Sequence, residues 1–502
     1  MKIINISMAK GLNILFCTSE VTPYSKTGGL ADVSNSLPQE LNAFGHAVRI
    51  ITPKYGPLDE RKLRIYEIKR LTGIEVPVGD KIYICNIKSS FVTSPKGKVQ
   101  VFLIENNELY GNANPYLDPK SGKDYENNDE RFIFYNRAVV QVLGLLGWQP
   151  DIIHCNDWQT GLIPAYLKTI HSKDPLLNSV KSVFTIHNLA YQGLFPHSSF
   201  LKTGLPDSIY NQDGVEYHNH FSFLKTGLIF SDVITTVSEN YAKEITTTNE
   251  YGYGFEGILK KRKKDLQGIL NGVDYTVWNP ERDRMIPFRY SSKELPLKRE
   301  NKKSLCTHFK LEYNPEIPVL GLISRIAEQK GFDLIEKIMP DLMKEDIYFI
   351  ILGTGDKYYH KFFESWKKKC PKKIGLHLGF SEEIAHLIEA GSDMFLMPSK
   401  YEPCGLNQMY SLRYGTIPVV RATGGLADTI TEYKNGKGNG FLFDKYEPAP
   451  MLAAIKRAIK LYKNREEWVK LVRLAMGFDF SWEVSAKKYV DLYRSLIKKE
   501  KV

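Results

Sequence analysis

Long apolar runs are missing from this chain of 502 residues. None approaches the roughly 20 residues that a membrane-spanning helix needs, so an integral membrane protein is excluded. The first apolar stretch, Leu12 to Cys17, is short and lacks a small-residue cleavage pattern. It predicts a first strand rather than a secretion signal, and we expect a cytoplasmic protein with no membrane partner.

Cysteine is also scarce, and its spacing excludes two kinds of protein. No two of the six cysteines form a CxxC pair. This argues against a disulfide framework and against a zinc site, and predicts reduced thiols that are mostly buried. The cysteines are Cys17, Cys85, Cys155, Cys306, Cys370 and Cys404.

Common catalytic and cofactor signatures are absent or out of context. There is no GxSxG and no HExxH sequence, which speaks against serine esterases and zinc proteases of the usual types. Gly252–Gly257 fits GxGxxG, but the residues before it (Thr246–Glu250) are polar and form no predicted strand. We therefore expect no dinucleotide cofactor there.

Charge is of mixed sign with a positive surplus of +11. Such a surplus can indicate nucleic acid, anionic lipid or a phosphorylated ligand. Most lysines stand in ordinary polar segments, and the one dense run is Lys260–Lys264. We favour a solvated face and no nucleic-acid partner, with polyanion binding as the alternative.

What the chain does contain is a repeated alternation of short apolar runs and segments of helical spacing. Ile14–Cys17 and Val48–Thr52 predict strands on either side of a helix, Leu30 to Phe44, which Gly45 ends. Strand, loop and helix in repeated order predict an α/β fold with doubly wound parallel sheets covered on both faces.

The pattern restarts after Asn279-Pro280, which predicts two Rossmann-like domains. We place an N-terminal domain at 1–265, a hinge near 265–280 and a C-terminal domain at 275–480. Residues 481–502 read as one amphipathic helix, which we expect to pack back on the N-terminal domain.

A six-residue repeat marks two helix starts. Thr27–Asp32 reappears without change as Thr423–Asp428, and each copy follows a predicted strand and loop. Glycines at a helix start let an anion approach unpaired N–H groups, and Lys26 adds a full positive charge beside the first copy. Tight packing alone would also explain the glycines. The lysine precedes them, so this is not a P-loop.

Three charged residues follow predicted strands of the second domain. Arg325 and Lys330 come directly after one strand, and Glu402 lies in a Pro- and Gly-stiffened loop after another. Ligands of open parallel sheets bind beyond the carboxyl ends of the strands. Two cations there suit a diphosphate, and a carboxylate can bind sugar hydroxyls or stabilise a positive sugar carbon. In the first domain, Asp157 and His187 also follow strands.

Taken together, these motifs resemble bacterial glycogen synthase and plant starch synthase, the retaining glucan-elongating glycosyltransferases of the GT-B fold. The resemblance covers most of the chain in order. The motifs that carry it are Lys26–Val33, His154–Trp158, Thr185–Gly193, Asn271–Asp274, Ser324–Arg325, Gln329–Gly331, Glu402–Leu406 and Thr423–Asp428.

The resemblance implies two domains facing a central cleft, with the acceptor on the N-terminal side and the nucleotide sugar on the C-terminal side. It implies catalytic roles for Glu402, His187, Lys330 and Arg325, and an acceptor or sugar side lined by Asp32 and Asp157. His187 would offer its backbone carbonyl to the anomeric carbon. The implied donor-binding residues are Lys26, Gly29, Asn271, Phe380, Cys404, Gly405, Leu406, Thr423, Gly424 and Gly425.

Two departures from the family pattern concern the donor. Phe380 stands where a base-stacking tyrosine is common, and Asn407 stands where several relatives have threonine. No Asp-x-Asp occurs, so we expect no metal cofactor and a diphosphate neutralised by Lys, Arg and helix ends.

The expected activity is transfer of glucose from a nucleotide-glucose to the non-reducing 4-hydroxyl of an α-1,4-glucan such as glycogen or a malto-oligosaccharide. ADP-glucose is favoured as the donor over UDP-glucose. Retention without an evident nucleophile suggests front-face substitution. A GT-B transferase acting on a small sugar or a lipid is the nearest alternative. A non-catalytic glucan- or polyanion-binding protein is the second.

Overall fold

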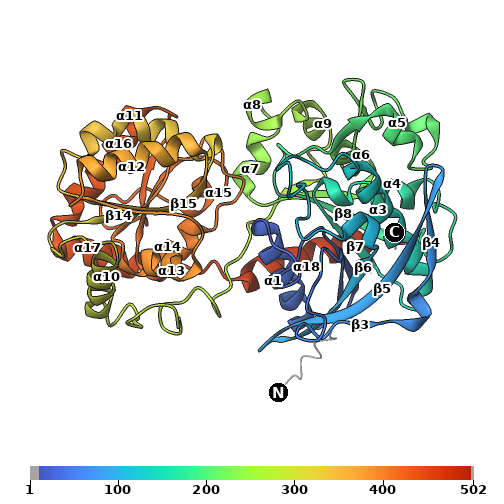
Figure 1. The fold of residues 1–502 in the computed structure, drawn as a ribbon, viewed down its shortest axis with the longest axis horizontal. Coiled ribbons are helices and arrows are strands. Elements are labelled where there is room, and N and C mark those ends of the chain that lie inside the picture. The colour runs from blue at the N-terminus through green and yellow to red at the C-terminus, as the bar shows by residue number, and fades with distance from the viewer. Residues whose placement is uncertain (1–10, 499–502) are drawn as a thin grey trace, which may run out of the picture. The chain divides into compact units, whose positions relative to one another are not determined.

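The computed structural model describes residues 11–498, which form two compact units. The first comprises the chain up to Val237, Glu244–Ile269 and the C-terminal segment from Trp482; the second comprises Ser238–Lys243 and Leu270–Ser481. Apart from the short segment Ser238–Lys243, the chain thus changes unit after Ile269 and again after Ser481. Each unit is an α/β body with its own sheet and its own core (Figure 1).

The first unit contains a ten-stranded sheet in the order β13-β12-β8-β7-β1-β2-β6-β5-β3, with β4 paired to β5. Seven neighbouring strands are parallel: β13 (Leu266–Gly268), β12 (Val233–Thr236), β8 (Lys181–Ile186), β7 (Ile152–Asn156), β1 (Asn13–Cys17), β2 (Ala47–Pro53) and β6 (Gly97–Glu105). The strands predicted from the short apolar runs of this half are all present.

The parallel sheet predicted for this unit has an antiparallel extension at one edge, which was not predicted from the sequence. Strands β3 (Tyr66–Glu67), β4 (Ile74–Val78) and β5 (Lys81–Ser94) pair antiparallel there. In β5 buried and more exposed residues largely alternate, as expected of a sheet that faces solvent on one side. A second, antiparallel sheet combines β9 (Leu194–Pro196), β10 (Glu216–Tyr217) and β11 (His220–Ser222).

Helices cover both faces of the large sheet, and α1 packs beside α18 (Figure 1). The helix predicted at Leu30 to Phe44 is α1, which ends just before Gly45. Gly45 itself adopts a φ of +86°. The helices of this unit are α1 (Gly29–Ala43), α2 (Asn107–Tyr110), α3 (Asn128–Leu145), α4 (Ile163–Lys168), α5 (His197–Leu201), α6 (Phe223–Phe230), α8 (Asn249–Gly252), α9 (Glu256–Lys261) and α18 (Trp482–Lys498).

The C-terminal helix α18 supplies part of the core of the first unit. Trp482, Tyr489 and Tyr493 are buried among residues of β1, β2 and α1. The Tyr493 hydroxyl lies 2.7 Å from Nδ1 of the buried His154, whose Nε2 lies 2.6 Å from Thr185 Oγ1. Burial lowers the pKa of His154 to about 3, so this imidazole is neutral.

Replacing Tyr493 by phenylalanine should therefore destabilise the first unit. The change leaves one nitrogen of a buried imidazole without its partner, which costs about 1–3 kcal/mol. We expect a lower thermal unfolding temperature for Tyr493→Phe. The exposed Tyr66 provides the control, because Tyr66→Phe removes a hydroxyl at the surface. Equal unfolding temperatures for the two variants would contradict this assignment.

The second unit is built on a six-stranded, wholly parallel sheet in the order β16-β15-β14-β17-β18-β19. Its strands are β14 (Val319–Ile326), β15 (Tyr348–Gly355), β16 (Ile374–Leu378), β17 (Met394–Met397), β18 (Ile417–Arg421) and β19 (Phe441–Phe443). Here the prediction of a doubly wound parallel sheet is confirmed.

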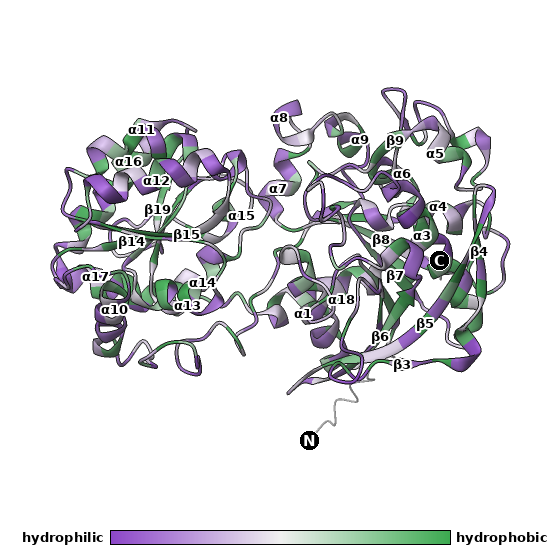
Figure 2. Ribbon diagram, viewed as in Figure 1, coloured by the Kyte–Doolittle hydropathy of each residue, from purple (hydrophilic) through white to green (hydrophobic). Residues whose placement is uncertain are grey.

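In Figure 1, α11, α12 and α16 lie on one face of this sheet and α10, α13, α14 and α17 on the other. The strands are mainly hydrophobic, whereas the helices are banded in hydropathy (Figure 2). The helices are α7 (Glu239–Glu244), α10 (Pro296–His308), α11 (Phe332–Leu342), α12 (Lys357–Lys369), α13 (Glu382–Gly391), α14 (Asn407–Tyr414), α15 (Gly424–Thr429), α16 (Pro448–Tyr462) and α17 (Arg465–Met476).

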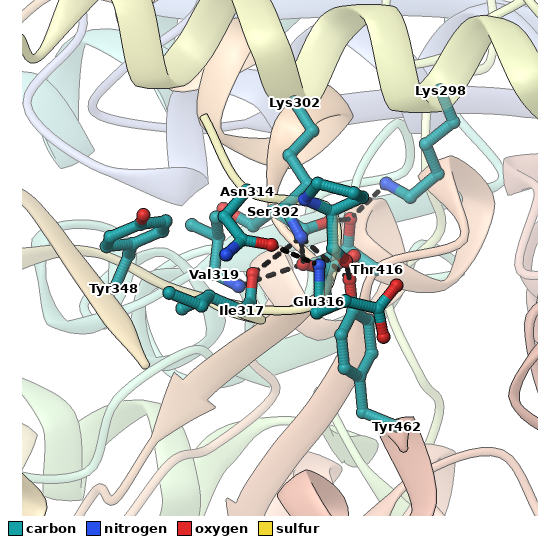
Figure 3. A network of polar contacts seen from close by, with 12 residues as sticks. Lys298, Lys302, Asn314, Glu316, Ile317, Val319, Tyr348, Ser392, Thr416 and Tyr462 are labelled. Atoms are coloured by element: carbon teal, nitrogen blue, oxygen red, sulfur yellow. Dashed lines mark hydrogen bonds and ion pairs between the residues drawn. The ribbon is translucent and has the colours of Figure 1, made fainter. Parts of the chain in front are cut away.

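Two buried lysines fix α10 against the rest of this unit (Figure 3). Lys298 Nζ donates to the Ala390 carbonyl at 2.9 Å and to Thr416 Oγ1 at 2.8 Å. Lys302 Nζ lies 2.8 Å from Asp393 Oδ2 and donates to the Tyr462 hydroxyl at 2.7 Å. Some of the lysines in this basic chain therefore have a structural role. Within residues 11–498, no helix is long and apolar enough to cross a membrane.

Candidate functional site

In the second unit, the strand order reverses between β14 and β17. The chain proceeds from β14 outward to β15 and β16, then returns to β17 on the other side of β14. Ligands of open α/β sheets bind at such a switch point, beyond the carboxyl ends of the two strands. Arg325 is the penultimate residue of β14, and Glu402 follows β17 by five residues. The topology therefore brings these predicted residues to the same end of the same pair of strands.

Lys330 and Glu402 form an ion pair at this switch point. Lys330 Nζ lies 2.6 Å from Glu402 Oε2, with the lysine side chain 20% exposed and the glutamate 8%. Ser399 Oγ donates to the same Oε2 at 2.9 Å. Within the described part of the chain, Oε1 receives no hydrogen bond. The pair thus leaves one carboxylate oxygen available to a ligand, while the ammonium can still donate two hydrogen bonds.

The loop that carries Glu402 is tied to the loop that carries Lys330. Gln329 Nε2 donates to the Tyr401 carbonyl at 3.0 Å, and the Lys400 N–H donates to the Gln329 carbonyl at 2.8 Å. Gly331 adopts a φ of +76°, and a Cβ there would lie 2.2 Å from the Pro398 carbonyl oxygen. This glycine lets the two loops approach closely enough for the ion pair to form.

The glycines of the second repeat also serve close packing. Gly424 has a φ of +45°, and a Cβ would lie 1.9 Å from the Glu402 carbonyl oxygen; a Cβ on Gly425 would lie 2.1 Å from the Cys404 carbonyl oxygen. The Gly425 N–H donates to the carbonyls of Glu402 and Pro403 at 3.1 and 3.2 Å. The family resemblance implies that this N–H assists in binding the diphosphate. In the structure the Gly425 N–H is already hydrogen-bonded to the loop that carries Glu402, called the Glu402 loop below. The main role of the motif is therefore to fix that loop.

The remaining predicted residues of this unit lie in different settings. The Arg325 side chain is exposed and forms no ion pair with any residue between 11 and 498, so it is free to meet an anion. Cys404, Gly405 and Leu406 lead into α14, and Thr423 precedes α15.

Three further residues of the second unit stand at positions that the family resemblance connects with the donor. Asn407 Nδ2 donates to the Ile323 carbonyl of β14 at 3.1 Å, a structural use of this departure from the family pattern. Asn271 is buried, and its Oδ1 has no partner in the described chain. Phe380 follows β16 with 84% of its surface exposed. A large aromatic ring so exposed is available for stacking.

The first unit has a switch point of its own, between β1 and β7. The chain proceeds from β1 through β2 to β6 and returns to β7 on the other side of β1. The segment 18–28, called the Lys26 loop below, follows β1 and precedes α1, and Asp157 follows β7. Lys26 Nζ lies 2.8 Å from Asp32 Oδ1, so these two predicted residues pair with each other at the start of α1.

Sequence reasoning missed Glu20, which anchors the Lys26 loop. This buried carboxylate accepts hydrogen bonds from the Thr27 N–H and, at 2.7 Å, from Thr27 Oγ1. The Tyr116 hydroxyl, from a segment 96 residues away, donates to Glu20 Oε1 at 2.7 Å. No local spacing signals the contact with Tyr116, because that partner is distant in sequence.

Asp157 and His187 contact each other across neighbouring strands. The His187 N–H donates to Asp157 Oδ1 at 2.7 Å, and Asn156 Oδ1 lies 2.9 Å from His187 Nε2. Burial raises the pKa of Asp157 to about 7, although N–H groups of His187 and Asn188 oppose the shift. Asp157 also adopts φ 57° and ψ 179°, a region that non-glycine residues occupy only under strain and mostly at functional sites.

A resident metal site is not evident from the donor set. Among the described residues, no three His, Cys, Asp or Glu side chains gather as metal ligands. Cations and glycines, rather than carboxylate clusters, surround the switch point of the second unit.

Comparison with known families matches the two halves of the chain separately. The family model described as starch synthase catalytic domain matches residues 13–261, and that of glycosyl transferases group 1 matches residues 307–474. Each model thus falls on one of the two sheets.

Several bacterial relatives match along almost the whole chain. Proteins named glycogen synthase from Anaeromyxobacter sp. (strain Fw109-5) and Desulforudis audaxviator are 42% and 44% identical over 97% of this chain, covering 99% and 97% of their own lengths. The glycogen synthase of Thermosipho africanus is 42% identical over 98% of this chain and 100% of its own.

Solved structures give the same picture. The catalytic domain of Starch Synthase IV from Arabidopsis thaliana, bound to ADP and acarbose, matches with a TM-score of 0.88 at 31% identity, over 97% of this chain and 100% of that one. The sucrose-phosphate synthase of Thermosynechococcus elongatus, at 15% identity and a TM-score of 0.59, shares the fold alone. By sequence and by structure, the chain belongs to the family of bacterial glycogen synthases and plant starch synthases, glycosyltransferases of the GT-B fold that transfer glucose to a glucan.

Proposed function

We propose that this protein elongates glycogen by transferring glucose, with retention of anomeric configuration, from ADP-glucose to the non-reducing 4-hydroxyl of an α-1,4-glucan. The observation that carries the proposal is the Lys330–Glu402 pair at the switch point of the second unit. It combines a cation for a phosphate with a carboxylate for a sugar in adjacent positions. The preference for ADP-glucose over UDP-glucose follows from the resemblance, and the starch synthase structure that holds ADP supports it.

In the second unit, Arg325 and Lys330 would bind the donor diphosphate. The exposed guanidinium of Arg325 can bind two oxygens at once. Glu402 Oε1 and the unpaired Oδ1 of Asn271 would accept hydrogen bonds from hydroxyls of the donor glucose. Phe380 would stack on the nucleobase. Cys404, Gly405, Leu406, Thr423 and the two glycines would shape the loops that present these groups.

In the first unit, Lys26 and Gly29 would assist at the donor phosphate, and Asp32 and Asp157 would line the sugar and acceptor side. Asp157 fixes the backbone of His187 through the 2.7 Å hydrogen bond to its N–H. The carbonyl of His187 would then face the anomeric carbon and stabilise its developing positive charge.

Catalysis would consist mainly of positioning and electrostatic stabilisation. The departing diphosphate would accept the proton of the attacking 4-hydroxyl on the same face of the sugar. Lys330 and Arg325 would lower the barrier by neutralising that leaving group, a role we assign to them without a metal ion.

We place the enzyme in the cytoplasm. All six cysteines are free thiols, and five are buried, as expected of a protein from a reducing compartment. We assign it no nucleic-acid or membrane partner.

The direct test is to incubate the protein with ADP-[¹⁴C]glucose and glycogen and to precipitate the polymer. The proposal requires label in the polymer that β-amylase releases as maltose. Label found only in a small acceptor or a lipid would overturn it, as would binding of glycogen without transfer. Parallel kinetics with UDP-glucose measures the donor preference.

Phe380 provides a prediction about the donor alone. Stacking of a base on an aromatic ring is worth roughly 1–3 kcal/mol, so Phe380→Ala should raise KM for ADP-glucose about tenfold or more with little change in kcat. Phe380→Tyr keeps the stacking face and should keep KM near the wild-type value. Because the ring is exposed, neither change should affect unfolding. An unchanged KM in Phe380→Ala would remove this residue from the donor site.

A further inference from the structure

Asn156 is the last residue of β7 and is fully buried. Its side-chain amide contacts two backbone carbonyls and one imidazole. Its Nδ2 donates to the Cys17 carbonyl at 2.9 Å and to the His154 carbonyl at 3.3 Å. Its Oδ1 lies 2.9 Å from Nε2 of His187. Neither the sequence motifs nor the family resemblance assigned this residue a role.

These contacts determine which way round the amide lies. The carbonyls of Cys17 and His154 can only accept hydrogen bonds, so the NH₂ group must face them. Reversing the amide would bring its oxygen against two carbonyl oxygens, at the cost of two buried hydrogen bonds. Oδ1 must therefore face His187.

The orientation of the amide in turn determines the tautomer of the histidine. An amide oxygen can only accept, so His187 Nε2 must carry a proton and donate it to Asn156. Burial lowers the pKa of His187 to about 3, and the ring is accordingly neutral at ordinary pH. A neutral imidazole with its proton on Nε2 has a lone pair on Nδ1. Within residues 11–498, Nδ1 makes no hydrogen bond.

We propose that Asn156 is a positioning residue that holds His187 as the Nε2–H tautomer, so that Nδ1 can accept a hydrogen bond from a sugar hydroxyl of the substrate. Asn156 fixes the ring while Asp157 fixes the main chain of the same histidine. Two consecutive residues at the end of β7 thereby control both parts of His187. The substrate part of this inference rests on the proposed function; the tautomer does not.

The tautomer can be measured on the wild-type enzyme without substrate. In protein labelled with ¹⁵N-histidine, long-range proton–nitrogen correlations distinguish a protonated Nε2 from a protonated Nδ1. The chain has 11 histidines, and the signal of His187 is the one that disappears in His187→Gln. We expect a proton on Nε2 and no titration between pH 5 and 9. A proton on Nδ1 would overturn the proposal even if no Asn156 variant folds.

Asn156→Asp tests the contact itself. A carboxylate facing Nε2–H favours the imidazolium, so the pKa of His187 should rise by at least about one unit. At pH 8, where the ring is still neutral, kcat should stay within about tenfold of wild type; on acidification it should fall more steeply than in wild type, because the protonated ring has no lone pair on Nδ1. An unchanged His187 titration in folded Asn156→Asp would contradict the proposal.

Asn136→Asp is the matched control. Asn136 is another fully buried asparagine of the first unit, and its Nδ2 likewise donates to two backbone carbonyls, those of Phe132 and Gln159. Its replacement creates the same repulsion without touching His187 and should leave the His187 titration as in wild type. If the wild-type enzyme showed the Nε2–H tautomer but transferred no glucose to glycogen, the proposed function would fail and the tautomer would stand.

Discussion

Lys330→Ala is expected to lower the turnover of glucosyl transfer at least about 10²-fold, the loss typical when one preorganised donor is removed from a developing negative charge. Two effects of the substitution add. On the proposed assignment the leaving diphosphate loses a cation, and Glu402, whose side chain is 8% exposed, keeps only the Ser399 hydroxyl on its Oε2. Glu402→Ala should cost at least as much, because it removes the carboxylate to which we assign binding of the donor glucose. Initial rates at saturating ADP-glucose and glycogen measure both losses.

The structure offers a matched control for this pair. Lys400 lies in the same loop as Glu402, but its ammonium is 3.9 Å from the largely exposed Glu328. Such a surface pair contributes little, so Lys400→Ala should retain nearly wild-type turnover. Because Lys330 and Glu402 act as a unit, the double variant should lose much less than the product of the two single losses. A folded Lys330→Ala enzyme with wild-type rates would refute the assignment.

The prediction of the fold succeeded where hydrophobic patterning acts locally. In the second unit, runs such as Val319–Ile323 became strands because a parallel sheet covered on both faces buries most of the apolar residues of its central strands. The antiparallel edge formed by β3, β4 and β5 was not predicted from the same patterning. In β5, residues of the two faces alternate along a strand exposed on one side, and the position of such a strand depends on pairings that the local sequence does not specify.

The site shows the same difference between local and distant contacts. Lys330 and Glu402 were identifiable because each follows a strand, and parallel strands bring their carboxyl ends together. Glu20 was not identifiable, because its role depends on Thr27 and on Tyr116, which lies 96 residues further along the chain. Asn156 escaped for a different reason. In its sequence motif, a role was assigned to the neighbouring Asp157 only. The orientation of the Asn156 amide becomes clear only from the positions of two carbonyls in the structure.

The glycines of the second repeat required coordinates as well. From sequence alone, their role could be anion binding or close packing. The hydrogen bonds from the Gly425 N–H to the carbonyls of Glu402 and Pro403 favour packing as their first role. Because these glycines let α15 approach the backbone at Glu402 and Cys404 so closely, we expect their substitution to displace that backbone.

Gly424→Ala should accordingly abolish most activity although it changes no charged group. The added Cβ would lie 1.9 Å from the Glu402 carbonyl oxygen at a φ of +45°, so either the Glu402 loop or the start of α15 must move. A displacement of about 1 Å at a positioned group costs about 10²-fold in rate, and we expect at least that loss in kcat.

Gly436→Ala is the control that separates the effect of the steric clash from the effect of the backbone strain. Gly436 has a φ of +75°, but an added Cβ would meet nothing within 4 Å, so this variant should lose some stability, on the order of 1 kcal/mol, and keep its kcat. If the two alanine variants were equally active, close approach of Gly424 to the Glu402 loop would not be what the repeat provides.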